Sequence, residues 1–391
     1  MFDHADRRVE GGNTSTWGRR GLNRIKRIAL GPSMSVRLME LVAMEVRRFA
    51  YASIEFGTTG PMKFTALELC VGAGGQALGV ERAGFDHEAA VDVDVDACET
   101  VRLNRPKWQV LNQDIRDLDG RDFRGIDLLA GGIPCPPFSI AGRQLGELDE
   151  RDLFPEALRI AQQAEPAAIM LENVKGLAGE RFAKYRRRII ERLMQLDYRV
   201  AWRVLFASDF GVPQLRPRFV LVALRGGPAQ RFSWPESAGA PPTVGDAIGD
   251  LMAANGWKGA SKWRQRADTI APTLVGGSKK HGGPDLGPTR ARHQWAELGV
   301  DGLGIVDEPP NASFPADSMP RLTVRMAARL QCFPDNWVFA GGKTSAYRQV
   351  GNAFPPPVAR AVAESIRSAL KGGSSTRRNR PLSLFEEPVD A

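Results

Sequence analysis

Short apolar runs alternate with amphipathic stretches along most of the chain between residues 64 and 370. The runs are rich in Val, Ile, Leu and Ala, a pattern typical of strands that are buried on both faces of a sheet. Such alternation predicts an α/β fold, a doubly wound Rossmann-like sheet with helices on both faces. We expect strands at 64–71, 87–91, 108–111, 126–130, 167–171, 200–205 and 219–224.

Helices are expected where apolar residues recur at helical spacing. Asp152 stands where an N-cap belongs, and the prolines at 355–357 precede the last helix, as is common at helix starts. The expected helices span 76–83, 152–163, 182–196, 321–333 and 358–370.

Between residues 225 and 320 the periodicity fades while Gly and Pro become frequent. We expect a smaller, irregular domain there, and a catalytic domain made of residues 62–224 and 321–371. Tryptophans interleave with Lys and Arg in this segment, which suits the reading of nucleic acid. The alternative is an ordinary small domain whose tryptophans form its core. The tryptophans are Trp234, Trp257, Trp263 and Trp295.

The two ends of the chain carry no chemistry that the sequence identifies. Residues 1–61 are a basic arm rich in Arg, Gly and Ser, with disorder as one expectation and an amphipathic helix at 34–49 as another. Because the strand pattern begins abruptly after Met62, two alternatives stay open: the arm belongs to the protein, or Met62 is the true start. Residues 372–391 are expected to be a disordered tail.

Composition narrows the range of partners. The chain of 391 residues has a formal net charge of +8 and a pI near 9.5, which favours a polyanionic partner such as nucleic acid. Its four cysteines lie far apart and the four histidines do not cluster near them, so no metal site is expected. No apolar run reaches the ~18 residues of a membrane span. We therefore expect a cytoplasmic protein with reduced thiols.

The loop after the expected strand 126–130 holds a cysteine between prolines, Pro134-Cys135-Pro136. Proline fixes φ and restricts the preceding residue to extended conformations, so Cys135 is expected on a stiff loop at a strand end. Enzymes of the α/β class place reactive groups at such ends. An isolated cysteine is more often a small buried thiol, and other residues must decide between these alternatives.

Two further segments bring polar side chains toward the same edge of the sheet. The expected strand 167–171 ends at Glu172, and because parallel strand ends open on one edge, Cys135 and Glu172 should converge over one ligand. Before the strand 219–224, alternation places Arg216 and Arg218 on one face. A thiol, a carboxyl and two guanidiniums suit an electron-rich planar substrate. Taken alone, Glu172 could be a surface carboxylate, and the arginines a solvated strand edge.

A glycine turn, Gly72-Ala73-Gly74-Gly75, follows the first expected strand and opens a helix. Glycines at that point let the backbone approach a ligand at a helix N-terminus. Asp92 follows about 20 residues later, where an acid can bind ribose hydroxyls, while Asp96 is available as a helix cap. Asp114 ends the third expected strand in the same way.

In these segments and in their order, the chain resembles the bacterial DNA (cytosine-5)-methyltransferases of restriction-modification systems. The resemblance covers about residues 64–370 and includes the helix beginning at Arg321 and the pair Gly351-Asn352. It implies an S-adenosylmethionine site on the first half of the sheet, completed by the last helix. The residues that it assigns to this cofactor are Leu69, Gly72, Gly74, Gly75, Asp92, Val93, Asp114, Ile115, Pro134 and Asn352. Cys70 replaces the family's usual Phe and Asp92 its usual Glu, which bears on cofactor affinity more than on cofactor identity.

The activity that the resemblance implies agrees with the residue types. C5 of cytosine is a poor nucleophile until a thiolate adds to C6 and makes C5 an enamine carbon. Cys135 is assigned as that thiolate and Glu172 as the protonated donor to N3. Arg218, with Arg216 beside it, is assigned to the carbonyl O2. The target base must leave the duplex stack for these atoms to be reached.

The resemblance implies double-stranded DNA as partner, a monomer, sequence choice within 225–320, and an open expectation of pairing with a restriction endonuclease. A tRNA methyltransferase of the same family is the nearest alternative. Those relatives carry Cys-Phe-Thr in the recognition segment, and no Cys lies between Arg218 and Pro320. A nucleotide-dependent oxidoreductase would leave Cys135 and Glu172 without a role. A DNA-binding module with a dead site is disfavoured because both residues are intact.

Overall fold

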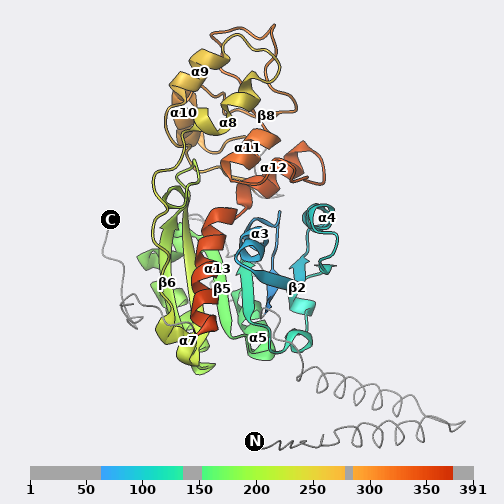
Figure 1. Cartoon of the computed structure of the whole chain (residues 1–391), viewed down its shortest axis with the longest axis vertical. Helices are drawn as coiled ribbons and strands as arrows, with labels where there is room; N and C mark the ends of the chain where they lie inside the picture. Colours follow the sequence, from blue (N-terminus) through green and yellow to red (C-terminus); the bar gives the residue numbers. More distant parts are fainter. Residues whose placement is uncertain (1–62, 135–151, 278–284, 373–391) are drawn as a thin grey trace, which may run out of the picture. The chain divides into compact units, whose positions relative to one another are not determined.

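A seven-stranded sheet in the order β3-β2-β1-β4-β5-β7-β6 lies at the centre of the fold (Figure 1). The computed structural model describes residues 63–134, 152–277 and 285–372, so the expected arm, the tail beyond residue 372 and Cys135 lie outside the described residues. Neighbouring strands are parallel except at β7, which is antiparallel to both β5 and β6. The strands are β1 (Phe64–Leu69), β2 (Phe85–Asp92), β3 (Val110–Asn112), β4 (Leu128–Gly132), β5 (Ala168–Val174), β6 (Tyr198–Phe206) and β7 (Pro217–Arg225).

The sheet is doubly wound, as the sequence predicts. From β1 the chain passes outward to β2 and β3, then returns past β1 to β4 and continues in the other direction. This reversal places the switch point of the topology between β1 and β4, where α/β proteins bind their ligands. In the parallel register Leu69 lies beside Gly131, and Gly132 lies beside Glu172. The glycine turn, the loop at Pro134 and Glu172 therefore open on one edge.

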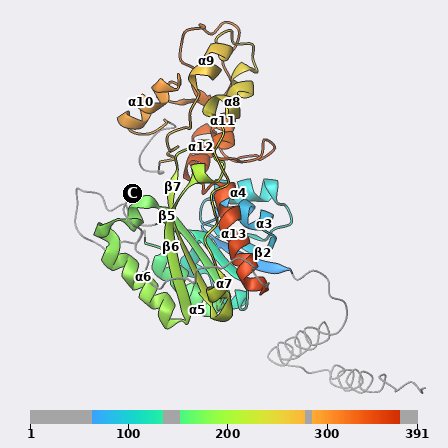
Figure 2. The same cartoon turned by 60° about the vertical axis from the view of Figure 1, so that its left-hand side comes forward.

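Helices cover both faces of the sheet (Figure 2). On one face, α5 (Phe154–Ala164) and α6 (Ala183–Gln195) bury their apolar residues against β4 and β5. On the other face, α3 (Gly75–Arg82), α7 (Gly226–Arg231) and α13 (Pro356–Lys371) share a second core with the sheet. The helix α13 buries residues at a spacing of three and four, and Gly372 ends it in the left-handed conformation.

Five further helices of the described chain form a third core beyond the carboxyl edge of the strands (Figure 1). Trp257, Trp263 and Trp295 are buried in this core, while Trp234 packs edge-on against Phe232. Trp257, Trp263 and Trp295 are therefore core residues, as the alternative from the sequence states, whereas Trp234 is half-buried. The helices are α8 (Val244–Ala253), α9 (Ala260–Arg266), α10 (Thr289–Glu297), α11 (Val324–Leu330) and α12 (Lys343–Asn352).

Some elements differ from the expectation for local reasons. The helix α4 (Val95–Asn104) is capped by Asp94, whose side chain accepts bonds from two backbone N–H groups, so Asp96 is not the cap. The stretch 321–333 begins with β9 (Leu322–Thr323), which pairs with β8 (Ile305–Val306), and α11 follows with Thr323 as its cap. Helix α12 was not expected, because its Gly and polar residues weaken the apolar period.

Glu172 lies inside β5 rather than after it, because β7 pairs with β5 as far as Val174. Similarly, α5 begins at Phe154, whose N–H donates to the Asp152 carboxylate at 3.1 Å, and Leu153 is the cap residue. Five short 3₁₀ helices complete the described chain: Ile115–Asp117, Gly120–Phe123, Lys175–Ala178, Glu180–Phe182 and Ala207–Asp209.

Candidate active site

A cavity of about 320 Å³ opens at the switch point, within the size range of small-molecule sites. The glycine turn, the ends of β2, β3 and β5, and the end of α12 contribute to its wall. Of the residues that the sequence assigns to a cofactor, those lining it are Gly72, Gly75, Asp92, Val93, Asp114, Ile115, Pro134 and Asn352. Leu69 and Gly74 are not among its lining residues, because Leu69 is fully buried in the sheet core and Gly74 packs on Trp337.

The three glycines of the turn are needed for different reasons. Gly72 has a φ of +53° and open space where a Cβ would lie, so its backbone faces the cavity without cover. At Gly74, with a φ of +80°, a Cβ would lie 3.0 Å from the Trp337 ring. At Gly75 it would lie 2.5 Å from the carbonyl oxygen of Phe354, which permits no side chain there. Only Gly72 therefore keeps space free for a ligand.

Asp92 ties the glycine turn to the end of β2. One carboxylate oxygen accepts from the N–H of Gly72 at 2.8 Å, and the other accepts from the N–H of Asp94 at 2.8 Å. Each oxygen keeps a lone pair for a ligand hydroxyl. Burial raises the pKa of Asp92, and the two backbone donors oppose that rise. The side chain is thus held in place and still faces the cavity.

Glu172 and Arg218 form a buried ion pair beside this cavity. Arg218 Nε lies 2.8 Å from Glu172 Oε1, and both side chains are about nine-tenths buried. They come from β5 and β7, where the antiparallel register sets Glu172 opposite Val220. Burial raises the pKa of Glu172 above its ordinary value, although Arg218 and then Arg216 act to lower it. A carboxyl that holds a proton can donate it.

Arg216 is fully buried, and its two terminal nitrogens donate mainly to backbone carbonyls, while its Nε has no partner among the described residues. Its two terminal nitrogens donate to the carbonyl oxygens of Leu274 and Gly351, at 2.7 Å each, and one also donates to Gln214 Oε1 at 3.3 Å. The guanidinium therefore joins three segments that lie far apart in the sequence. In the described structure Arg216 supports the wall of the site, whereas Arg218 contacts Glu172 directly.

Asn173, the residue after Glu172, fixes the loop that leads toward Cys135. Its Nδ2 donates to the carbonyl oxygen of Ile133 at 2.6 Å. Since Pro134 is the last described residue before Cys135, this bond places the entry to the Cys135 loop next to Glu172. Cys135 itself lies outside the described residues.

The sequence did not single out several residues of the cavity wall. Gln76 follows the glycine turn in α3, and Arg348 reaches to 4.0 Å from Asp94. No spacing rule marks Gln76 and Arg348, because their places depend on α3 and α12 meeting at the switch point. Cys70, which the sequence does mark as the replacement of the family's Phe, lines the same wall in a left-handed conformation, with a φ of +53°.

Within residues 63–134, 152–277 and 285–372, no group of three or more His, Cys, Asp or Glu side chains is arranged to hold a metal ion. Among the helices of those same ranges, none has the length and apolar character needed to cross a membrane.

A doubly wound sheet with a glycine turn, acidic side chains after β2 and β3, and a cavity at the switch point defines the class of S-adenosylmethionine-dependent methyltransferases. The sequence profile of the C-5 cytosine-specific DNA methylases matches residues 64–368. The chain belongs to this family. It is a DNA (cytosine-5)-methyltransferase, and S-adenosylmethionine is its methyl donor.

Relatives of known description agree with that membership. The chain is 56% identical over 308 residues to the Type II methyltransferase M.NaeI of Lentzea aerocolonigenes, covering 78% of this chain and 75% of the relative. It is 52% identical over 314 residues to the Type II methyltransferase M.NgoMIV of Neisseria gonorrhoeae, covering 79% of this chain and 99% of the relative. The alternative of tRNA as substrate receives less support from these relatives.

Solved structures share the fold at low identity. A variant of Spodoptera frugiperda DNMT2 superposes with a TM-score of 0.57 at 19% identity, over 78% of this chain and 100% of that chain. The Entamoeba histolytica methyltransferase EhMeth gives a TM-score of 0.56 at 14% identity, over 79% of this chain and 99% of that one.

The cavity fits the chemistry of S-adenosylmethionine. Asp92 and Asp114 offer acceptors for hydroxyl and ammonium groups, and Val93, 68% exposed on the rim, offers an apolar surface for a flat ring. The open space at Gly72 admits close approach to backbone. When bound, the donor supplies a methyl group on a positively charged sulfur. The replacement of Phe by Cys70 removes a ring from the wall but leaves these other features in place.

Proposed function

We propose that this methyltransferase methylates C5 of a cytosine flipped out of a specific duplex DNA sequence, through a covalent bond between Cys135 and C6. The observation that carries this proposal is the buried pair of Glu172 and Arg218, which lies beside the cofactor cavity and next to the loop leading to Cys135. A carboxyl on the cavity wall with a guanidinium paired to it suits the N3 and O2 edge of cytosine.

Each residue has a distinct task in this proposal. The Cys135 thiolate adds to C6, and the electron pair displaced from the C5–C6 bond makes C5 nucleophilic. Glu172 donates its proton to N3, where negative charge would otherwise develop. Arg218 holds O2 and compensates charge in the same pocket. Arg216 keeps Arg218 in place by joining β7 to Leu274 and Gly351.

The cofactor assignments follow from the cavity. Gly72, Gly75, Asp92, Val93, Asp114, Ile115, Pro134 and Asn352 are proposed to contact S-adenosylmethionine. Leu69 and Gly74 are proposed to shape the site from beneath, because one packs in the sheet core and the other against Trp337. This division predicts that substitutions in the two groups have different effects.

Target choice is proposed to reside within residues 225–320, with phosphate contacts from its basic surface. The described part of this segment keeps several cations in pairs, such as Lys262 with Asp317 at 2.8 Å and Arg264 with Asp246 at 3.0 Å.

The relatives named Type II methyltransferases support a role in a restriction-modification system, with host DNA protected from a partner endonuclease. We propose further that the enzyme acts as a cytoplasmic monomer.

Trapping on 5-fluorocytosine tests the proposed mechanism. Release of the enzyme requires loss of the C5 proton, and fluorine at C5 prevents that step. Duplex DNA with 5-fluorocytosine at the target position should yield a denaturant-resistant protein–DNA complex that requires S-adenosylmethionine. The complex should vanish in Cys135→Ala and persist in Cys98→Ala, a matched loss of a thiol whose pKa burial raises to about 11. Mass spectrometry that places the cross-link on Cys70, Cys98 or Cys332 would reject the mechanism.

A further inference from the structure

The side-chain amide of Gln76 lies in the same cavity as Glu172 and has no role in the mechanism above. Gln76 is the second residue of α3, and its side chain is only 4% exposed. Its amide nitrogen donates to the carbonyl oxygen of Met170 at 3.4 Å. Its amide oxygen, Oε1, is buried and has no hydrogen-bond partner in the described part of the chain. A buried acceptor of this kind costs free energy unless a donor reaches it.

Gly132 shows where that oxygen points. A Cβ on Gly132 would lie 3.3 Å from Glu172 Oε2 and 3.9 Å from Gln76 Oε1, so both oxygens border the space that a side chain would fill. Met170 and Glu172 are two residues apart on β5, and their side chains therefore share the face that α3 covers. The Gln76 amide is held at the Met170 end of this face through Nε2, and its Oε1 borders the same space as Glu172 Oε2.

The other oxygen of Glu172 is already engaged, because Oε1 pairs with Arg218 Nε at 2.8 Å. Among the described residues, the charged groups that act on Glu172 are Arg218 and Arg216. Glu172 Oε2 and Gln76 Oε1 border the same space, and a proton on Oε2 would give the unpartnered Gln76 acceptor a donor. We propose that Gln76 is a positioning residue, whose Oε1 accepts the hydrogen bond of protonated Glu172 and keeps its carboxyl in the acid form until N3 of cytosine takes the proton.

This inference rests on the proposed role of Glu172 and goes one step beyond it. With its Nε2 bound to Met170, Gln76 offers Glu172 an acceptor only, so it stabilises the acid relative to the carboxylate. Burial raises the pKa of Glu172, in agreement with a proton on that carboxyl. The enzyme thereby holds a proton donor ready beside an arginine that alone would favour the ionised form.

The test is the pH dependence of single-turnover methyl transfer to duplex DNA at saturating S-adenosylmethionine. In the wild type the rate should fall on the alkaline side as Glu172 loses its proton, and this limb should be absent in Glu172→Gln. Gln76→Leu removes the acceptor, so the alkaline limb should move to lower pH by about one unit. At pH values above the shifted limb, the methyl-transfer rate should be about tenfold lower than in the wild type. Gln76→Glu is nearly isosteric and adds a carboxyl that shares the proton, so the limb should move to higher pH.

Gln349→Leu is the matched control. Gln349 also lines the cavity and is buried, but its amide is bonded to Thr100 and Ala340, so its loss should leave the limb in place. An unmoved or upward-shifted limb in Gln76→Leu overturns the inference, as does a change confined to the KM for S-adenosylmethionine. A limb retained in Glu172→Gln rejects the proposed function itself and the inference with it. If the alkaline limb moves to lower pH in Gln76→Leu and to higher pH in Gln76→Glu, the result supports the inference even where Gln76→Leu lowers the stability of the fold.

Discussion

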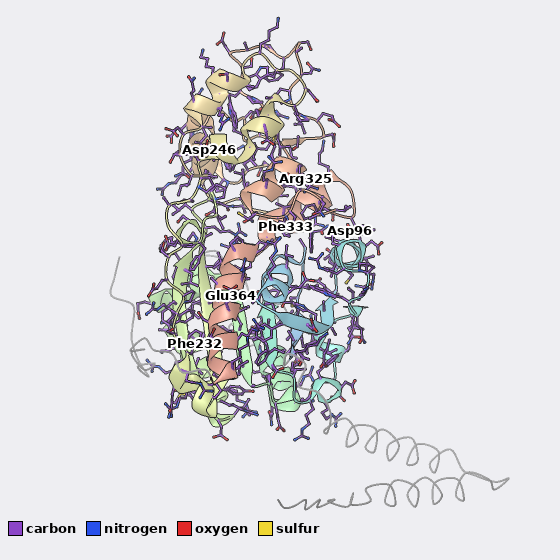
Figure 3. All side chains as sticks on the ribbon, in the orientation of Figure 1. Asp96, Phe232, Asp246, Arg325, Phe333 and Glu364 are labelled. Atoms are coloured by element: carbon purple, nitrogen blue, oxygen red, sulfur yellow. The ribbon has the colours of Figure 1, made fainter. Side chains whose placement is uncertain are left out.

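Trp337 Nε1 donates a hydrogen bond to the carbonyl oxygen of Ala73 at 3.1 Å, across 264 positions of the sequence. The indole is buried, and its ring supports Gly74 from beneath. The glycine turn is thus shaped by its own φ angles and also by a residue that follows α11. The centroid of the Trp337 ring lies 5.8 Å from that of Phe333, which is labelled in Figure 3. The segment after α11 therefore supports, from behind, the glycine turn that borders the cavity.

Trp337→Phe should weaken cofactor binding without touching the cavity wall. Phenylalanine keeps most of the apolar contact but leaves the Ala73 carbonyl without its donor, which costs about 1–3 kcal/mol. We expect a loss of thermal stability and an S-adenosylmethionine affinity lower by about tenfold, measured by calorimetry. Trp295→Phe, in the same core but away from the turn, should lose stability with unchanged cofactor affinity. Equal affinities in the two variants would contradict the role of Trp337.

Gly72→Ala and Gly74→Ala should change different properties, the first mainly cofactor affinity and the second mainly stability. At Gly72 a Cβ meets nothing within 4 Å, so the variant should fold with a penalty of about 1–2 kcal/mol for its positive φ and lose cofactor affinity. At Gly74 the Cβ would lie 3.0 Å from the Trp337 ring, so the main effect of Gly74→Ala should be a lower free energy of unfolding. Denaturation and calorimetry on both proteins separate the two effects. A Gly72→Ala protein with full affinity would show that the ligand does not approach this turn.

The sequence was sufficient to predict the doubly wound sheet, because strands that are buried on both faces appear in the sequence as short apolar runs. It also predicted that Glu172 and the end of the strand before Cys135 lie on one edge, and Gly132 and Glu172 do pair in a parallel register. Cys135 itself lies outside the described residues, so its convergence with Glu172 stays a prediction. It could not predict the partners of Arg216 or the place of Gln76. Those depend on where α12 and the segment at Leu274 return in space, and no local pattern encodes such a return.

The tryptophans of 225–320 illustrate a second limit. Alternation with basic residues suits both a nucleic-acid surface and a small core, and burial decides between them. Trp295 is fully buried, and Trp257 and Trp263 are nearly so. These large side chains fill the core of the described helices of this segment. Composition alone could not separate these cases.

Glu68→Gln should raise stability progressively as the pH increases. Glu68 is fully buried in β1, with His87 Nε2 at 3.6 Å from its Oε2. Burial raises the pKa of Glu68 above its usual 4.5, and His87 opposes the rise. The folded state therefore holds this proton more tightly than the unfolded chain, so its stabilising contribution is complete below pH 4.5 and is lost as the pH rises through the folded pKa.

Glutamine stays neutral at every pH, so the unfolding free energy of Glu68→Gln should exceed that of the wild type by an increasing margin, about 1.4 kcal/mol per pH unit within that window. Urea denaturation at several pH values measures it. Glu99→Gln, which removes an exposed carboxyl on α4, serves as the control. A constant difference for Glu68→Gln would mean that the carboxyl is not held protonated by the fold.

The location of target choice can be tested by exchanging a segment whose ends do not interrupt the sheet core or the small two-stranded sheet. Ala229 and Phe232 lie in the sheet core beneath α13, so an exchange from residue 225 would remove part of the catalytic domain's core. Ile305 pairs with Leu322 in the small sheet, so an exchange beyond it would separate β8 from β9. An exchange of residues 240–303 avoids both.

A chimera carrying the 240–303 segment of a relative with a different target sequence should methylate the relative's sequence, because base contacts set site preference while phosphate contacts set general affinity. The residues of α8 that pack on α11, among them Val244 and Ile248, are kept from this chain to preserve the shared core. Sequencing of methylated cytosines in duplex DNA reads the outcome, and thermal denaturation checks the fold. The matched exchange of residues 225–320 should show the same change of site but a lower melting temperature. A folded, active 240–303 chimera that still methylates the original sequence would place target choice outside this segment.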